Sequence, residues 1–306
     1  MNYIEPNIKI WEQGCNPDNL MAGVWAHIAR CVRVCYQSET KKNPSEGDEA
    51  FVRRVIMAHK PENSEANHLA MLEHGTIYLS IPYTDNDTLE HYYGTTGKYN
   101  QIPFTNKYSK VVMTRGEYNY VTTNLRVLVE NNWLDDLKYI SAPTELHEKR
   151  ITVCFTTDLG VSREFNRHRV DSVAEESTRY CNYNKKNNGE INYSLSAWFD
   201  EYAKEYLNDK QYAPYVDYII DIYNTDENDE LDEEWSDLDY YMFALRTCEF
   251  CYNGLIRKGW KAQMARQVLP LATKTQLVHT AFISDWIHFL KLRAVGISVL
   301  LILMHI

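Results

Sequence analysis

Apolar residues in the first part of the chain recur at helical spacing. Between Asn19 and Cys35 they occupy positions 20, 24, 25, 28, 29, 32 and 35, which places them on one face of a helix. We therefore predict an amphipathic helix over 19–35. A polar stretch follows it, residues 50–59 return to helical spacing, and 70–81 pass from helical spacing to the alternation of a strand.

The centre of the chain predicts a strand that leads into a helix. In 150–159, apolar residues at Ile151, Val153 and Phe155 alternate with polar ones, as in a strand with one buried face. The basic residues of 162–169 are then spaced as on a helix. The predicted strand is therefore followed directly by the most basic segment of the chain.

The remaining segments complete a mixed pattern. Two long helices are predicted at 238–260 and 275–293, with Pro270 interrupting the segment between them. Residues 83–125, rich in Tyr, Asn and Thr, predict loops with one short hairpin. The chain has 306 residues, of which 44% are hydrophobic, and no repeat or linker divides it. We predict a single α/β (α+β) domain over 1–306.

Charge and hydropathy exclude some classes of protein. A net charge of −10 argues against binding to nucleic acid or an anionic membrane surface, because both need a basic field. The apolar run 294–306 is shorter than the roughly 20 residues of a membrane-spanning helix. It predicts a buried terminal segment, or an end whose sequence has been altered. No basic segment followed by an apolar run opens the chain, so we expect a cytoplasmic protein.

The cysteines and a strongly acidic segment have ordinary explanations. Seven cysteines, an odd number, predict reduced thiols. The pairs Cys31/Cys35 and Cys248/Cys251 have helical spacing in apolar surroundings, which favours core thiols over a metal site. Residues 226–239 hold nine acids but lack the glycine of a calcium loop, which favours a solvated loop. We predict no metal site.

A basic cluster stands out in this acidic chain. Four basic side chains lie within thirteen residues: Arg167, His168, Arg169 and Arg179. Like charges at this density need carboxylates or an external anion beside them. Neighbouring acids allow simple pairing at a helix end. Arg266 and Arg293, both in apolar settings, favour an anion pocket instead, because a guanidinium keeps its charge when desolvated and binds phosphate through two hydrogen bonds.

The basic cluster resembles a known motif. The segment "RHRVDSVAEES" is similar to the R-H-R-x7-S signature of the flavin-dependent thymidylate synthases, with Arg167, His168, Arg169 and Ser177 in the motif positions. Five further blocks resemble that family in the same order: 33–39, 71–81, 177–180, 265–270 and 288–293. The resemblance implies the family's single α/β domain and a homotetramer, with insertions at 83–145 and 185–240.

The resemblance also implies an activity and a set of site residues. The reaction is reductive methylation of dUMP to dTMP, with methylenetetrahydrofolate as one-carbon donor and FAD, reduced by NADPH, as hydride source. The implied flavin-binding residues are His74, Arg167, His168, Arg169, Glu175 and His288. The implied dUMP-binding residues are Glu164, Arg167, Glu175, Glu176, Ser177, Thr178, Arg179, Arg266 and Arg293.

Two of these residues are expected to act in catalysis. Arg293 would polarise the uracil edge at N3, since a fixed cation favours negative charge in the ring. Ser177 would position the substrate rather than attack it, because no His–Asp pair accompanies it. A serine that only caps a helix is the alternative for Ser177.

This chain departs from the family pattern at three places. Residues 282–284 read Phe-Ile-Ser where the family commonly has N-x-R, Ala70 replaces a hydroxyl residue, and the resemblance stops after Ala294. The first departure supports an alternative function, a nucleotide-binding relative that keeps the dUMP arginines but lacks productive flavin binding. A basic patch for nucleic acid is a third option, which the negative net charge disfavours.

Overall fold

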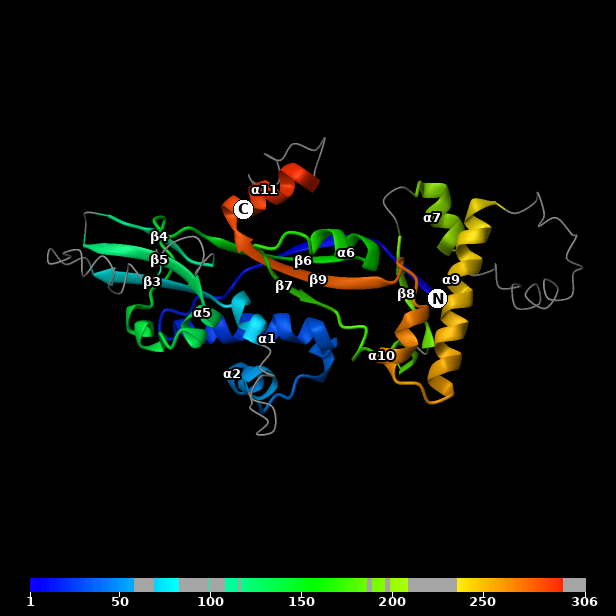
Figure 1. Cartoon of the computed structure of the whole chain (residues 1–306), viewed down its shortest axis with the longest axis horizontal. Helices are drawn as coiled ribbons and strands as arrows, with labels where there is room; N and C mark the ends of the chain where they lie inside the picture. The colour runs from blue at the N-terminus through cyan, green and yellow to red at the C-terminus, as the bar shows by residue number, and fades with distance from the viewer. Residues whose placement is uncertain are drawn as a thin grey trace, which may run out of the picture. The chain divides into compact units, whose positions relative to one another are not determined.

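A computed structural model describes residues 1–57, 69–82, 99, 108–114, 117–185, 189–195, 199–208 and 236–293 (Figure 1). The chain divides into two units. Unit 1 comprises Met1–Asn7, Phe155–Glu164 and Glu176–Gln276, and unit 2 comprises Ile8–Cys154, Phe165–Glu175 and Leu277–Ile306. The mixed helix and strand content agrees with the predicted α/β class, while the single domain stays a prediction.

Several predicted segments fall wholly or partly outside the described residues. They are the larger part of the insertion 185–240, much of the insertion 83–145, most of the acidic segment 226–239 and the terminal run 294–306.

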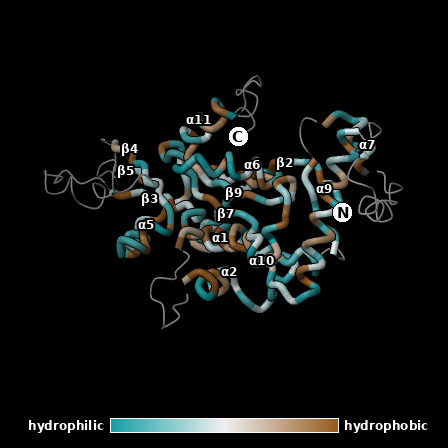
Figure 2. Tube along the Cα trace, turned by 45° about the vertical axis from the view of Figure 1, so that its right-hand side comes forward, coloured by the Kyte–Doolittle hydropathy of each residue, from teal (hydrophilic) through white to brown (hydrophobic). Residues whose placement is uncertain are grey.

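The first helices of unit 2 form where the apolar pattern places them. Helix α1 spans Leu20–Tyr36, and the side chain of Asn19 caps it by accepting from the backbone N–H of Ala22. The next elements are η1 (Glu39–Lys41), α2 (Asp48–Val52), the π-helical turn η2 (Arg53–Met57), η3 (Leu69–His74) and strand β3 (Thr76–Pro82). These elements confirm the predicted helices and the helix-to-strand passage at 70–81. Hydrophobic positions are prominent in α1 and α2 (Figure 2).

Unit 2 also contains a three-stranded antiparallel sheet with the strand order β3-β5-β4. It contains β4 (Lys110–Val112) and β5 (Tyr118–Asn124), with Thr76 opposite Asn124 and Lys110 opposite Thr122. The β4/β5 pair confirms the predicted hairpin. Helix α5 (Leu125–Glu130), capped by the Asn124 side chain, and η4 (Leu134–Tyr139) follow.

A four-stranded sheet carries the basic motif, in the order β2-β6-β9-β7. Its strands are β2 (Asn7–Trp11), β6 (Arg150–Asp158), β7 (Ser172–Glu175) and β9 (Lys274–Phe282). Strand β6 confirms the strand predicted at 150–159. Helix α6 (Leu159–Phe165) follows β6, and helix α11 (Ile283–Arg293) follows β9.

Two sequence predictions are wrong in this region. Residues 275–293 were expected to be one helix, but 274–282 form strand β9, which is buried on both faces and so has no amphipathic pattern to read. The predicted helix over 162–169 ends at Phe165, because the chain then turns twice before β7 begins.

In unit 2, α1 and α11 lie on opposite sides of these strands (Figure 1). Val278 of β9 packs with Cys31 and Val34 of α1. The next residue, His279, points to the other face and contacts Trp286 and Phe289 of α11. This alternation places the two faces of β9 in different environments.

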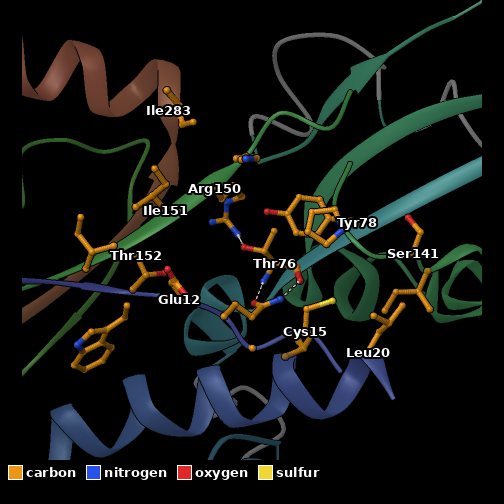
Figure 3. A pocket seen from close by; sticks show the side chains of 18 residues that line it. Glu12, Cys15, Leu20, Thr76, Tyr78, Ser141, Arg150, Ile151, Thr152 and Ile283 are labelled. Atoms are coloured by element: carbon orange, nitrogen blue, oxygen red, sulfur yellow. Dashed lines mark hydrogen bonds between the residues drawn. The ribbon is translucent and has the colours of Figure 1, made fainter. Parts of the chain in front are cut away.

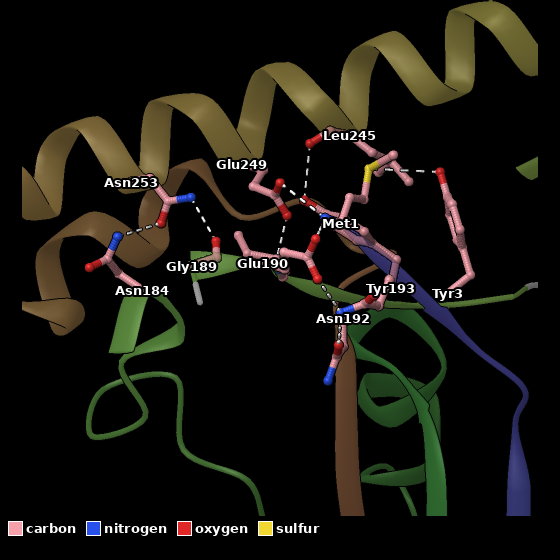
Figure 4. A network of polar contacts seen from close by, with 12 residues as sticks. Met1, Tyr3, Asn184, Gly189, Glu190, Asn192, Tyr193, Leu245, Glu249 and Asn253 are labelled. Carbon is pink, nitrogen blue, oxygen red and sulfur yellow. Dashed lines mark hydrogen bonds and ion pairs between the residues drawn. The ribbon is translucent and has the colours of Figure 1, made fainter. Parts of the chain in front are cut away.

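Unit 1 is organised around helix α9 (Asp237–Arg257). A capping box formed by Ser236 and Asp239 stabilises the N-terminus of this helix. The helix confirms most of the one predicted at 238–260. Glu249 accepts from the backbone N–H of Ile191, Asn253 donates to the carbonyl of Gly189, and Tyr193 donates to that of Leu245 (Figure 4). These bonds attach the segment around β8 to the helix.

The other elements among the described residues of unit 1 are short. Besides α6, most of which lies in this unit, they are the parallel pair β1 (Asn2–Ile4) and β8 (Asn192–Ser194), η5 (Tyr183–Lys185), α7 (Glu201–Asn208), α10 (Ala262–Ala265) and η7 (Arg266–Val268). None of the seven cysteines, all of which lie among the described residues, forms a disulfide, as their odd number predicts. Cys31 is buried, as expected of a core thiol, but Cys251 is exposed and Cys248 only half-buried, so the prediction of core thiols is wrong for that pair.

The packing of Gly75 against α1 gives a test of the fold. A Cβ at this position would lie 2.5 Å from Ile28 Cδ1 and 2.8 Å from Val24 Cγ1. We expect Gly75→Ala to lower the free energy of unfolding by about 1–3 kcal/mol through overpacking. Gly254→Ala, inside α9 with open space around it, is the matched control and should stabilise by about 1 kcal/mol. Urea unfolding measures both, and equal effects would contradict the packing at Gly75.

Candidate functional site

The R-H-R segment forms a double turn between α6 and β7. The backbone N–H of His168 donates to the carbonyl of Phe165 at 3.0 Å, and that of Asp171 donates to the carbonyl of His168 at 3.2 Å. Arg167 and Arg169 are exposed on this turn, whereas His168 is half-buried. The turn is fixed at its end by β7, which pairs with β9.

Arg293 and His168 meet although 125 positions separate them. The Nε of Arg293 donates to Nε2 of His168 at 3.1 Å, which requires that imidazole nitrogen to be unprotonated. Burial lowers the pKa of His168, and the charge of Arg293 acts in the same direction. The His168 ring also lies 4.5 Å from the ring of Phe289 and 6.4 Å from that of His288. Three predicted site residues therefore gather at the end of α11.

His74 lies in the interior of unit 2. Its Nδ1 is 2.8 Å from Thr280 Oγ1, which is 2.7 Å from Thr152 Oγ1, which in turn is 2.8 Å from Nε2 of His27. Burial lowers the pKa of His74 well below its usual range. Since the ring is fully buried, any effect of His74 on a ligand has to pass through neighbouring groups.

The segment after β7, in unit 1, contains four of the nine predicted dUMP residues. Glu176 is buried and pairs with Lys274 Nζ at 2.8 Å. The Oγ of Ser177 accepts from the backbone N–H of Arg179, so this serine caps a turn. Arg266 Nη1 donates to Thr178 Oγ1 at 3.2 Å, which brings together two predicted residues 88 positions apart.

The predicted residues divide between the two units. Unit 2 contains all six predicted flavin residues and, of the dUMP set, Arg167, Glu175 and Arg293. Unit 1 contains Glu164, Glu176, Ser177, Thr178, Arg179 and Arg266. Within unit 2, Glu175 accepts from Asn166 Nδ2 at 3.1 Å, beside the R-H-R turn. Glu164, on α6, is exposed.

Arg150 is a polar core residue that the sequence reasoning missed. It donates to the carbonyl of Glu73, to Thr76 Oγ1 and to Ser172 Oγ, the first side chain of β7. Burial lowers its pKa to about 10. Among the described residues no carboxylate lies within ion-pair distance of it. The sequence did contain a signal, the arginine of "KRITV" at the start of a predicted strand. An arginine at the start of a strand is easily taken as solvent-exposed, so its buried role was not predicted.

Arg150 lines a cavity of about 410 Å³ in unit 2 (Figure 3). Tyr78, Cys15 and Ile283 also line it, and the lining residue Gln13 exchanges two hydrogen bonds of 2.8 Å with the backbone of Thr76. None of the predicted site residues is among the described residues that line this cavity.

Residues 282–284, where the family commonly has N-x-R, make other contacts in this chain. Phe282 is buried, with Lys110 Nζ 4.6 Å and the Arg150 guanidinium 5.6 Å from its ring centroid. Ser284 accepts from Lys110 and donates to Glu148. The chain therefore fills these positions with a core contact and a small polar cluster.

An α/β protein that gathers guanidinium and imidazole groups at a turn beside a sheet is suited to bind anionic ligands. A family model described as thymidylate synthase complementing protein matches residues 118–296. The chain belongs to this family, the flavin-dependent thymidylate synthases, so the resemblance seen in the sequence is confirmed. Membership supports thymidylate synthesis as the general activity. A search of curated proteins found no match.

Two further observations concern the described residues alone. None of their helices combines the length and the apolar character that crossing a bilayer requires. They also contain no group of three or more His, Cys, Asp or Glu side chains placed to hold a metal ion.

The buried histidine chain predicts a loss of stability in acid. Loss of hydration lowers the pKa of His27 from its usual 6.5 to about 4, and Arg30 and Arg150 act in the same direction. Between these values the unfolded chain binds more protons than the folded one, so stability falls as the pH falls. We expect His27 alone to reduce the free energy of unfolding by about 2 kcal/mol between pH 7 and pH 5.

Urea unfolding of the parent and of His27→Gln at both pH values measures this contribution. The variant should lose less stability on acidification than the parent, although His74 contributes a loss of the same sign to both proteins. Identical losses in the two proteins would show that His27 is not held neutral by the fold.

Proposed function

We propose that this protein methylates dUMP to dTMP, with methylenetetrahydrofolate as one-carbon donor and FAD, reduced by NADPH, as hydride source. The proposal is supported most directly by the contact between Arg293 and His168, which joins the R-H-R motif to the last family block. Family membership supports the general activity. A homotetramer and a cytoplasmic location belong to the same proposal.

The side chains of the R-H-R turn suit a flavin dinucleotide. FAD carries an anionic pyrophosphate, and exposed guanidinium groups bind such groups through charge-assisted hydrogen bonds. Arg167 and Arg169 would hold that group. His168 on the same turn, Glu175 at the end of β7 and His288 on α11 would orient the cofactor. When bound, FAD supplies the hydride that completes the new methyl group.

The dUMP residues would bind and polarise the substrate. Arg266, oriented by its bond to Thr178, would neutralise the phosphate, with Arg179 beside the same turn and Glu164 and Glu176 completing the wall. Ser177 would position the nucleotide through the turn that it caps. Arg293, whose Nε donates to His168, would present its guanidinium to the uracil edge, where a fixed cation would favour negative charge in the ring.

A nucleotide-binding relative without productive flavin binding remains the alternative. The observation in its favour is that Phe282 and Ser284 are engaged with Lys110 and Glu148 rather than offering an amide and a guanidinium. This alternative keeps dUMP binding and loses the redox step. Flavin content therefore separates the two functions.

The visible absorption spectrum of the purified protein, with and without added FAD, is the decisive experiment. We expect a bound oxidised flavin, and we expect Arg169→Ala to weaken its binding about 10-fold or more through loss of a charge-assisted contact. Arg163→Ala, an exposed arginine on α6 outside the predicted set, is the control. A protein that stays colourless with added FAD would support the alternative function.

Substitution of Arg266 tests the nucleotide side. We expect Arg266→Ala to raise the KM for dUMP roughly 10-fold to 100-fold, because a charge-assisted contact to phosphate is lost. Arg257→Ala, an exposed arginine at the end of α9 in the same unit, should leave this KM unchanged. Steady-state kinetics with varied dUMP measures both, and an unchanged KM in Arg266→Ala would assign this residue to the structure of the turn.

A further inference from the structure

A buried Asp–His pair lies directly behind the R-H-R turn. Asp171 Oδ2 and His279 Nδ1 are 2.8 Å apart, and their side chains are 1% and 0% exposed. Neither residue belongs to the family motif or to the predicted site. A buried carboxylate is costly unless it is hydrogen-bonded, so this bond strongly constrains both groups.

The pair connects the turn to the middle of β9. Asp171 ends the turn, because its own N–H donates to the carbonyl of His168, and β7 begins at the next residue. His279 lies opposite Val173 in the β7–β9 register. The side-chain bond therefore joins the turn to the strand across the first residues of β7, where the backbone pairing starts.

The same aromatic cluster contacts both His279 and His168. The ring of His279 lies 6.5 Å from that of Phe165 and 6.2 Å from that of Phe289, and these two phenylalanine rings are 5.1 Å apart. Phe289 in turn lies 4.5 Å from the ring of His168. The orientation of His168 thus depends on a cluster that includes His279.

We propose that Asp171 and His279 are a positioning pair, which holds the R-H-R turn so that His168 presents Nε2 to Arg293. Because both side chains are buried, the proposal gives the pair a positioning role and no direct contact with substrate or cofactor. Its effect on the turn can be measured without any ligand, whereas its effect on methylation rests on the proposed function.

The first test compares two substitutions of His279 in the ligand-free protein by hydrogen exchange and mass spectrometry. His279→Leu removes the donor to Asp171, and we expect the amides of residues 166–171 to exchange about 10-fold faster or more, with α9 and the β3–β5 pair unchanged. His279→Gln retains an N–H donor and should restore slow exchange. Should His279→Leu fail to fold, Asp171→Asn, which keeps the acceptor but loses its charge, should show a smaller acceleration in the same segment.

A control variant separates positioning from general stability. Asp136 is another buried carboxylate of unit 2, bonded to Tyr99 at 2.6 Å and distant in sequence from the turn. Asp136→Asn should leave exchange at 166–171 unchanged. Uniformly faster exchange throughout unit 2 in His279→Leu, or no change at 166–171, would overturn the proposal.

The second test follows catalysis in His279→Gln and Asp171→Asn. We expect Asp171→Asn to lower kcat for methylation about 10-fold, with the KM for dUMP within about 3-fold of the parent. The reason is that the substitution changes the orientation of the Arg293 guanidinium more than it weakens substrate binding. His279→Gln should retain near-parental kcat. If the parent binds no flavin, the proposed function fails while the exchange result still decides the positioning role, and a KM change without a kcat change would contradict that role.

Discussion

The antiparallel pairing of β7 with β9 is the constraint on which the candidate site depends. In this register Ser172, at the start of β7, lies opposite Thr280, near the end of β9. The turn that precedes β7 must therefore lie beside the helix that follows β9. This geometry explains why Arg293, at the end of α11, reaches His168 over 125 positions of sequence. A shift of one residue would turn every side chain of β7 to the opposite face and separate the two motif blocks.

The interior of unit 2 around these strands is unusually polar. A chain of hydrogen bonds links His27, Thr152, Thr280 and His74, and Arg150 bonds to three oxygens beside it. Both histidines are held neutral by burial, which avoids the much larger cost of a buried charge. The guanidinium of Arg150 keeps its charge, which three hydrogen bonds and the nearby charges of Glu73 and Asp285 stabilise. Such networks orient side chains strongly, because each member has few alternative partners.

Local patterns in the sequence predicted the elements that have one apolar face. Helix α1, strand β6 and helix α9 were found from their spacing, and the R-H-R motif was found from its resemblance to a family. Strand β9 was missed because both of its faces are buried, so its sequence has no period that distinguishes it from a helix. The Asp171–His279 bond and the role of Arg150 could not be predicted, since each depends on a register between segments that are far apart in the chain.

The departure at residues 282–284 follows from the same packing. Phe282, the last residue of β9, is buried, and the cationic groups of Lys110 and Arg150 lie close to its ring. Ser284 accepts a hydrogen bond from Lys110 and donates one to Glu148. An arginine at position 284 would place a second cation against Lys110, so the usual family residue and this lysine are mutually unfavourable. If the chain binds FAD as proposed, a flavin contact absent from this segment has to be supplied by other residues, and we propose the exposed guanidinium groups of the R-H-R turn. Under the proposed function, flavin affinity would depend on how rigidly that turn is held. The buried bond between Asp171 and His279, which ends on this turn, would then support cofactor binding without contacting the cofactor.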